Sequence, residues 1–388
     1  MGRLRILLVL LALLAAALPA GAAEPWDYLR PWQALQDRMA RGDGKARQAV
    51  ARMSAYLDRL FFSMPAETWK KRPNAEALFI YVLSGGNPRT IDRLLKDKVE
   101  TGIPSGALAG AAAYARGRNG LAWRLLGELK DEDMGLNART QLMLVKASLR
   151  ASVKPREAMR MLALVRLWKP GTLAEEAALR RGLLLAGREE DEGAFVRIAS
   201  AYLRRFRHSL YASDFLRVLA RFSVRLEVQA RPFIIERLSH ELALLSRRER
   251  ALFHAAVARG ALIDGKRRLA LMAAQRALDL YPEVEDFSIR MRLWMAAAQV
   301  ARPRPEDILR RLRELDESRL PPDDRRIRKA ALTVGEAIIR EPALSGEALA
   351  GGGPGKGGAS SAGEDLPVLV RARAAVAGVE KLLGEKRP

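Results

Sequence analysis

Apolar residues recur at three- and four-residue spacing from Trp26 to about Arg340, with breaks at Gly or Pro. This period is that of amphipathic helices, so the pattern predicts an all-α protein. One break stands out, Leu-Ser-Gly-Gly-Asn-Pro over residues 83–88. The glycines suit a left-handed helix cap, while Asn87 suits the cap and Pro88 the first position of the next helix. We expect a tight turn between two helices here.

From about residue 106 the predicted helices pair into hairpins. The pairs are 106–116 with 121–130, 141–149 with 156–168, 174–186 with 192–206, a less regular pair within 210–246, 249–258 with 266–281, and 287–300 with 305–315. Their starts recur at roughly 33 to 39 residues, close to the tetratricopeptide period of 34. Small residues such as Ala111, Ala112 and Ala255 would let paired helices approach closely. The sequence therefore predicts a tetratricopeptide-like solenoid of helical hairpins, with an irregular all-helical domain as the alternative.

The N-terminus has the pattern of an export signal. Arg3 and Arg5 precede an apolar run over residues 6–18, and small residues follow to Ala23. The run is shorter than the roughly 20 residues of a membrane-spanning helix, so we expect cleavage and not a retained anchor. No later segment approaches 18 consecutive apolar residues, so the processed protein is not expected to be an integral membrane protein. The processed protein is expected to be exported from the cytoplasm.

The amino-acid composition changes at about residue 341. A Gly-, Ser- and Pro-rich stretch is typical of a flexible linker, and helical spacing returns after it as a short amphipathic helix. The predicted organisation is a signal peptide (1–23), an N-terminal helical region (24–105), a solenoid (106–340), a linker (341–365) and a C-terminal amphipathic helix (366–388).

The amino-acid composition limits which covalent links, metal sites and partners can be expected. The chain has no cysteine, which excludes disulfides and thiolate metal sites. Its formal net charge of +22 favours anionic partners. For an exported bacterial chain these are lipid head groups, cell-wall polymers such as peptidoglycan, and acidic protein faces, whereas nucleic acid is not expected.

The sequence lacks the recognised catalytic motifs. His208, His240 and His254 lack metal-ligand spacing to one another, and no GxSxG or SxxK nucleophile motif occurs after the export signal. Glu317 before Ser318 is the one step that would suit a cell-wall lyase, but the glycine-rich catalytic lobe of such an enzyme does not follow. We predict a non-enzymatic binding protein with no cofactor, no metal and no catalytic residues; the residues that bind its partner stay undetermined.

Three stretches of the sequence carry a family resemblance. They are Arg72–Ala77 leading into the turn at 80–88, Pro170–Arg181, and 201–206 through 209–212. With the signal and the helical plan, these stretches resemble the motility protein C (MotC) family, exported accessory proteins of the bacterial flagellar motor. The Gly-rich linker and the tail helix have no counterpart in that resemblance.

The resemblance implies a role in flagellar rotation. A member of this family would act in the periplasm by binding the periplasmic part of the stator subunit MotB and helping it fold or stay in place. The expected contact surface is the concave face of residues 106–282. The alternative is a general envelope-assembly or peptidoglycan-binding scaffold, whose basic surface would engage an anionic polymer.

Overall fold

The computed structural model describes residues 23–227, 233–302 and 305–340. The predicted linker, the C-terminal helix and all of the export signal except Ala23 lie outside the described residues. All regular structure in the described part is helical, which confirms the predicted all-α class. The chain divides into two compact units, one ending at Phe215 and the other starting at Leu216, within helix α12.

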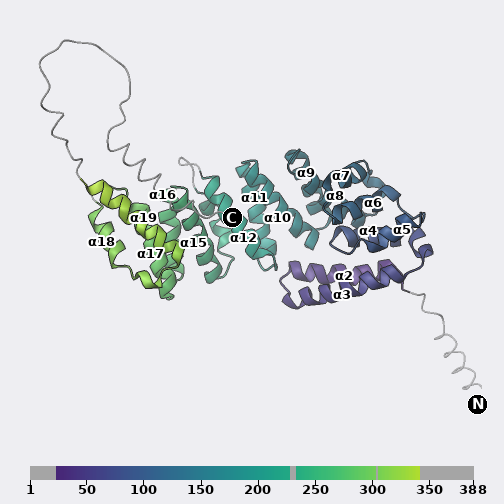
Figure 1. The fold of residues 1–388 in the computed structure, drawn as a ribbon, viewed down its shortest axis with the longest axis horizontal. Helices are drawn as coiled ribbons and strands as arrows, with labels where there is room; N and C mark the ends of the chain where they lie inside the picture. Colours follow the sequence, from purple (N-terminus) through teal and green to yellow (C-terminus); the bar gives the residue numbers. More distant parts are fainter. Residues whose placement is uncertain (1–22, 228–232, 303–304, 341–388) are drawn as a thin grey trace, which may run out of the picture. The chain divides into compact units, whose positions relative to one another are not determined.

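The first unit consists of short helices that pack on their neighbours in the chain (Figure 1). They are α2 (Pro25–Ala40), α3 (Gly44–Ser63), η1 (Ala66–Lys70), α4 (Arg72–Leu83), α5 (Arg89–Lys96), α6 (Ser105–Ala115), α7 (Asn119–Gly127), η2 (Asp131–Asp133), α8 (Leu136–Arg150), α9 (Pro155–Trp168), α10 (Leu173–Arg188), α11 (Glu192–Phe206) and the start of α12 (Ala212–Arg225).

The second unit repeats this plan. Its elements are the rest of α12, α13 (Ile234–Arg237), α14 (Ser239–Leu242), α15 (Arg247–Ile263), α16 (Arg267–Leu280), α17 (Glu285–Gln299), α18 (Glu306–Glu314), η3 (Glu317–Arg319) and α19 (Pro322–Ile339). Among the described residues of both units, no helix is long and apolar enough to cross a membrane.

Antiparallel hairpins are the repeating unit, as the sequence predicts. The packed pairs are α6 with α7, α8 with α9, α10 with α11, α15 with α16, and α17 with α18. Small residues line the seams: Ala111 is fully buried, and a Cβ added at Gly110 would lie 2.6 Å from the side chain of Leu126. The predicted helical-repeat architecture is confirmed. The structure adds one further hairpin, α2 with α3, before the residue at which pairing was expected to start.

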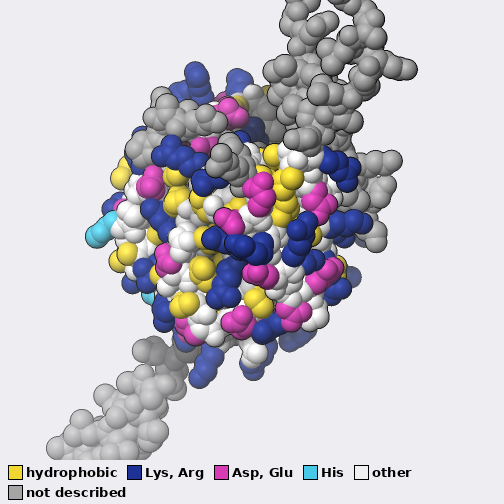
Figure 2. Space-filling view, turned by 90° about the vertical axis from the view of Figure 1, so that its left-hand side faces the viewer, with side chains coloured by type: hydrophobic (Ala, Val, Ile, Leu, Met, Phe, Trp, Pro, Cys, Tyr) yellow, Lys and Arg dark blue, Asp and Glu magenta, His cyan; other side chains and the backbone are white. Residues whose placement is uncertain are grey.

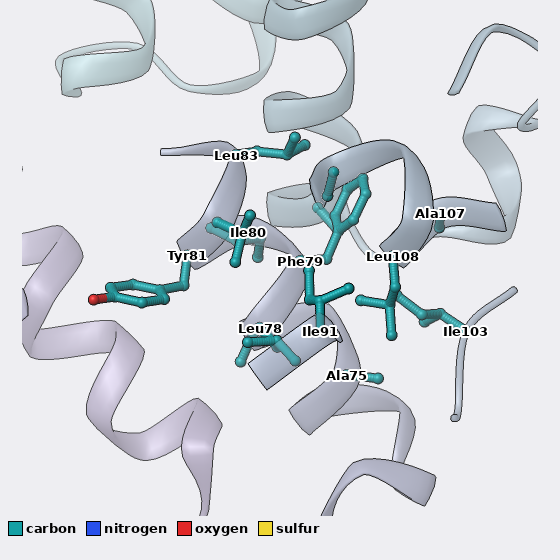
Figure 3. Packing of buried hydrophobic residues seen from close by; sticks show 14 of the residues in the cluster. Ala75, Leu78, Phe79, Ile80, Tyr81, Leu83, Ile91, Ile103, Ala107 and Leu108 are labelled. Carbon is teal, nitrogen blue, oxygen red and sulfur yellow. The ribbon is translucent and has the colours of Figure 1, made fainter. Parts of the chain in front are cut away.

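Helix α4 is the centre of the first unit's core. Leu78, Phe79, Ile80 and Tyr81 follow one another in its sequence, and each is at most 2% exposed. A helix that is apolar on all sides must be covered on all sides, and α4 packs against α2, α6, α8 and η1. Figure 3 shows its side chains meeting those of α5 and α6, with the Tyr81 ring on the opposite side.

The turn after α4 has the predicted left-handed cap. Gly85 has φ +103°, its N–H donates to the carbonyl of Val82, and the N–H of Gly86 donates to the carbonyl of Tyr81. This pair of bonds is the Schellman motif, which satisfies the last carbonyls of a helix. The next helix begins one residue later than expected, at Arg89, and the side chain of Asn87 accepts from its N–H at 3.0 Å.

Candidate functional site

The first unit contains a polar groove between α2 and α8, whose floor is formed by the end of α4 and the start of α10. Its volume is about 290 Å³. The four helices enclose it because α4 and α10 each pack against both α2 and α8. The lining residues are Gln33, Gln36, Asp37, Leu83, Ser84, Asn137, Thr140, Gln141, Leu144, Lys169, Thr172, Leu173, Ala174, Ala177, Arg180, Arg181 and Tyr211.

The start of α10 is fixed by its own sequence. Gly171 adopts φ +75°, and Thr172 caps the helix by accepting from the N–H of Glu175. The Glu175 carboxylate accepts from the N–H of Gly171 at 2.7 Å and also binds Arg205 of α11. Carboxylates are favourable in the first turn because the helix N-terminus carries free N–H groups and partial positive charge. These bonds set where α10 enters the groove.

Glu176 anchors the floor of the groove from inside. Its side chain is fully buried and accepts from Tyr202 Oη at 2.8 Å, from Ser209 Oγ at 3.3 Å and from Arg180 Nε at 2.9 Å. Burial, followed by the charge of Glu176, raises the pKa of the Tyr202 phenol far above its ordinary value. Tyr202 is therefore a neutral hydrogen-bond donor, and a buried charge with several donors is the arrangement that makes its burial tolerable.

Two arginines of α10 reach the groove differently. Arg180 is held by Glu176, and its guanidinium lies 4.4 Å from the ring centre of Tyr211. Arg181 donates to the carbonyl of Leu144 on α8 at 3.1 Å, and its side chain remains exposed. The surrounding protein removes water from around Arg181, and this desolvation lowers the pKa of its guanidinium. An exposed guanidinium that lines a groove can form charge-assisted hydrogen bonds with an anion.

The α2 wall is tied to α10 by Asp37. Its carboxylate accepts from the N–H of Leu173 at 2.8 Å, so a residue of α2 caps a helix more than a hundred residues later. Burial raises the pKa of Asp37, and this effect outweighs the hydrogen bond from Leu173 and the charges of Arg41 and Lys169.

The family-like stretches meet at this groove. Pro170–Arg181 supplies its floor, Ser84 comes from the turn at 83–88, and Tyr211 from the third stretch. The stretch at 72–77 has a different task outside the groove: Glu76 accepts from the N–H of Gly135, and Arg72 donates to the carbonyl of Asp133, which fastens the start of α8 to α4.

The residues considered for catalysis lie elsewhere. Glu317 is in η3, exposed, and bonded to Arg328 at 2.7 Å. His254 is 6% exposed; burial, with the charges of Arg276 and Arg250, lowers its pKa to about 4. Within the described residues, no cluster of three His, Cys, Asp or Glu side chains is arranged to hold a metal ion. The groove offers amides, hydroxyls and cations, which are groups for hydrogen bonding and charge recognition.

The predicted contact surface, the concave face of residues 106–282, overlaps the groove without containing it. The α10 part of the floor and the α8 wall fall within that range, but the α2 wall and the α4 part of the floor, Leu83 and Ser84, precede it. The position of Gln33, Gln36 and Asp37 opposite α8 could not be predicted, because the helical period shows which face of a helix is buried but not which helix covers it.

The excess of Lys and Arg over Asp and Glu does not form a continuous basic patch on the face shown in Figure 2. Lys and Arg side chains alternate there with Asp and Glu side chains. This mixing matches the ion pairs between the last elements of the second unit, among them Arg313 of α18 with Glu336 of α19 at 2.8 Å and Arg319 of η3 with Asp286 of α17 at 2.8 Å. Exposed pairs of this kind contribute at most about 1 kcal/mol each to stability, but they neutralise the surface locally.

Fold and groove together define a helical-repeat protein with a polar, amide-lined recess in its first unit. The chain belongs to the MotC family: the family model "Chemotaxis protein MotC" matches residues 2–385. It is similar to the chemotaxis protein MotC of Rhizobium meliloti (strain 1021), with 29% identity over 338 residues that cover 85% of this chain and 77% of that protein. No solved structure matches it.

Proposed function

We propose that this protein is a non-enzymatic accessory protein of the flagellar motor, which binds the periplasmic part of the stator protein MotB and helps it fold or remain in place. Membership of a chemotaxis family supports the process. One structural observation supports binding: three family-like stretches, distant in sequence, converge on one groove of hydrogen-bonding groups. A helical-repeat scaffold presenting such a surface is the usual design for holding another polypeptide.

Deletion of the gene tests the role in rotation. We expect cells with filaments of normal number, seen by electron microscopy, that do not swim, because the motor would be built but its stator would not be held. Swimming of the deletion strain at the normal rate would contradict the proposal. Restoration by the wild-type gene on a plasmid is the control for effects on neighbouring genes.

Location is tested separately. We expect the protein in the periplasmic fraction, with an N-terminus at Ala23 or Glu24 after cleavage of the export signal. Retention of residues 1–22 in a membrane fraction would instead indicate an anchor. Either result leaves the binding proposal to be decided by co-purification with the periplasmic part of MotB.

The alternative, a scaffold that engages peptidoglycan through positive charge, predicts salt-sensitive binding to purified cell wall, since screening weakens exposed charge interactions. The face in Figure 2 gives this alternative no support, because positive and negative side chains are interspersed on it. Binding to MotB that persists at high salt, with no retention on cell wall, would exclude the scaffold.

A further inference from the structure

Four carboxamide side chains face the groove from its two walls. Gln33 and Gln36 lie three residues apart on α2, and Asn137 and Gln141 lie four residues apart on α8. Residues at these spacings share one face of a helix. None of the four amides has a hydrogen-bond partner within the described part of the chain, and all four are half-buried. A fifth polar group is unsatisfied at the floor, the buried hydroxyl of Ser84.

Carboxamides recognise a specific kind of surface. Each has one oxygen that accepts and one NH₂ that donates, so it matches an N–H and a C=O equally well. An extended polypeptide presents such groups to one side at every second residue, or about 6.6 Å. The Cβ atoms of helix residues three or four apart are about 5–6 Å apart, a similar spacing. Two carboxamide pairs on opposite walls therefore fit the main chain of a strand lying between α2 and α8.

The charges show which side chain the strand would carry. Lys169 and Arg181 lie at the α10 end of the groove. The charge of Lys169 acts on Asp37, whereas Arg181 donates to the carbonyl of Leu144 and to no acidic side chain of the described residues. Arg180 is already neutralised by Glu176, and Asp37, the acid of the lining, is engaged with the N–H of Leu173. The charge at the α10 end of the groove that no acidic side chain balances is therefore positive. A carboxylate on the bound segment would complement it.

We infer that the groove binds an extended segment of a partner polypeptide, whose main chain is held by Gln33, Gln36, Asn137 and Gln141 and whose acidic side chain is held by Arg181 and Lys169. This inference rests on the proposed function for the identity of the partner, the periplasmic part of MotB. It adds the mode of recognition: a segment in extended conformation, read mainly through its backbone and one carboxylate.

The experiment measures peptide binding to the purified full-length protein. Fluorescent ten-residue peptides that tile the periplasmic part of MotB are titrated by anisotropy, and the intact periplasmic part is titrated in parallel. We expect one acidic peptide to bind. Two derivatives of it should each bind about tenfold more weakly or worse: one with Glu replaced by Gln, and one with two main-chain nitrogens methylated.

Groove variants provide the second readout. Gln36→Ala with Gln141→Ala should weaken the peptide by roughly 5- to 150-fold, the loss of two hydrogen bonds. Arg181→Gln should reduce the difference between the Glu and Gln peptides, because it removes one of the two cations that hold the carboxylate and leaves Lys169. The matched controls are Gln48→Ala on the exposed face of α3 and Arg188→Gln at the far end of α10. Unchanged circular dichroism melting confirms that each variant is folded.

The outcomes separate the two proposals. If the intact periplasmic part binds but no peptide does, or if binding survives the double amide variant, the inference is wrong and the proposed function stands. If neither the intact part nor any peptide binds the wild-type protein, the proposed function is wrong and the inference falls with it.

Discussion

The buried carboxylate of Glu176 is the group on which the geometry of the groove floor most depends. Replacing Glu176 with Ala removes the acceptor of Tyr202, Ser209 and Arg180 in one step. Removing one partner of a buried ion pair costs about 3–5 kcal/mol. The Arg180 side chain is 31% exposed and can regain water, so we expect the lower end of this range, about 3 kcal/mol.

The assay is thermal unfolding of the purified protein followed by circular dichroism. In a unit of this size, each kcal/mol lowers the melting temperature by about 2–4 °C, so Glu176→Ala should lower it by about 6–12 °C. Glu176→Gln keeps an acceptor for Tyr202 and should cost about 1–2 kcal/mol. The control is Glu189→Ala at the exposed end of the same helix, which should change the melting temperature by less than about 2 °C.

A double-mutant cycle identifies the cause. If the Tyr202 hydroxyl is left without an acceptor in Glu176→Ala, adding Tyr202→Phe should cost less than it does in the wild-type protein. We expect a coupling of about 1.5–3 kcal/mol between the two positions, typical of a hydrogen bond to a charged group. A melting temperature for Glu176→Ala equal to that of the Glu189→Ala control would refute the reasoning.

Three further predictions concern single positions. Gly86→Ala would place a Cβ 2.3 Å from the ring of Tyr81, and we expect a loss of about 1–3 kcal/mol in urea unfolding; an unchanged midpoint would show that the turn yields freely. Asp37→Asn keeps an acceptor for the N–H of Leu173. It removes a carboxyl group whose pKa is raised by burial. The folded wild type holds its proton to higher pH than the unfolded chain, so wild type should gain stability relative to the variant as the pH falls from 7 through the pKa of Asp37; a constant difference would contradict this. For His254 the folded pKa of about 4 lies below the unfolded value of 6.5, so between these values the unfolded state binds more protons and stability should rise with pH by about 3 kcal/mol. His254→Gln should flatten that rise in urea unfolding at pH 4.5, 5.5 and 7, and an equally steep rise in the variant would mean that other groups cause it.

The helices themselves could be predicted because local patterns define them. Residues 192–206 are expected as one helix and form α11 over the same residues, since Asp191 caps the start and the apolar period runs unbroken to Phe206. The turn at Gly85 was predictable for the same reason, because a left-handed residue that ends a helix is a local requirement.

The groove could not be predicted because its walls are distant in sequence. Glu175 and Glu176 have the appearance of solvated charges in the first turn of a helix, yet both are at most 1% exposed. Their burial depends on Tyr202 and Arg205 of the next helix, which periodicity alone does not orient toward them. The amides of α2 and α8 likewise have the pattern of ordinary exposed positions, and only the packing of α2 on α4 and α10 makes them face one another.

Stability and recognition are therefore assigned to different polar groups of the same groove. The carboxylates under the floor are saturated with donors, whereas the carboxamides on the walls have no partners in the described chain. Saturated buried groups hold a geometry, and unsatisfied accessible groups are the ones a ligand can use. It follows that Glu176→Ala should lower both the melting temperature and peptide affinity, while the Gln36 and Gln141 double variant should lower affinity alone. If the double variant lost stability as well, the amides would belong to the fold and not to the binding surface.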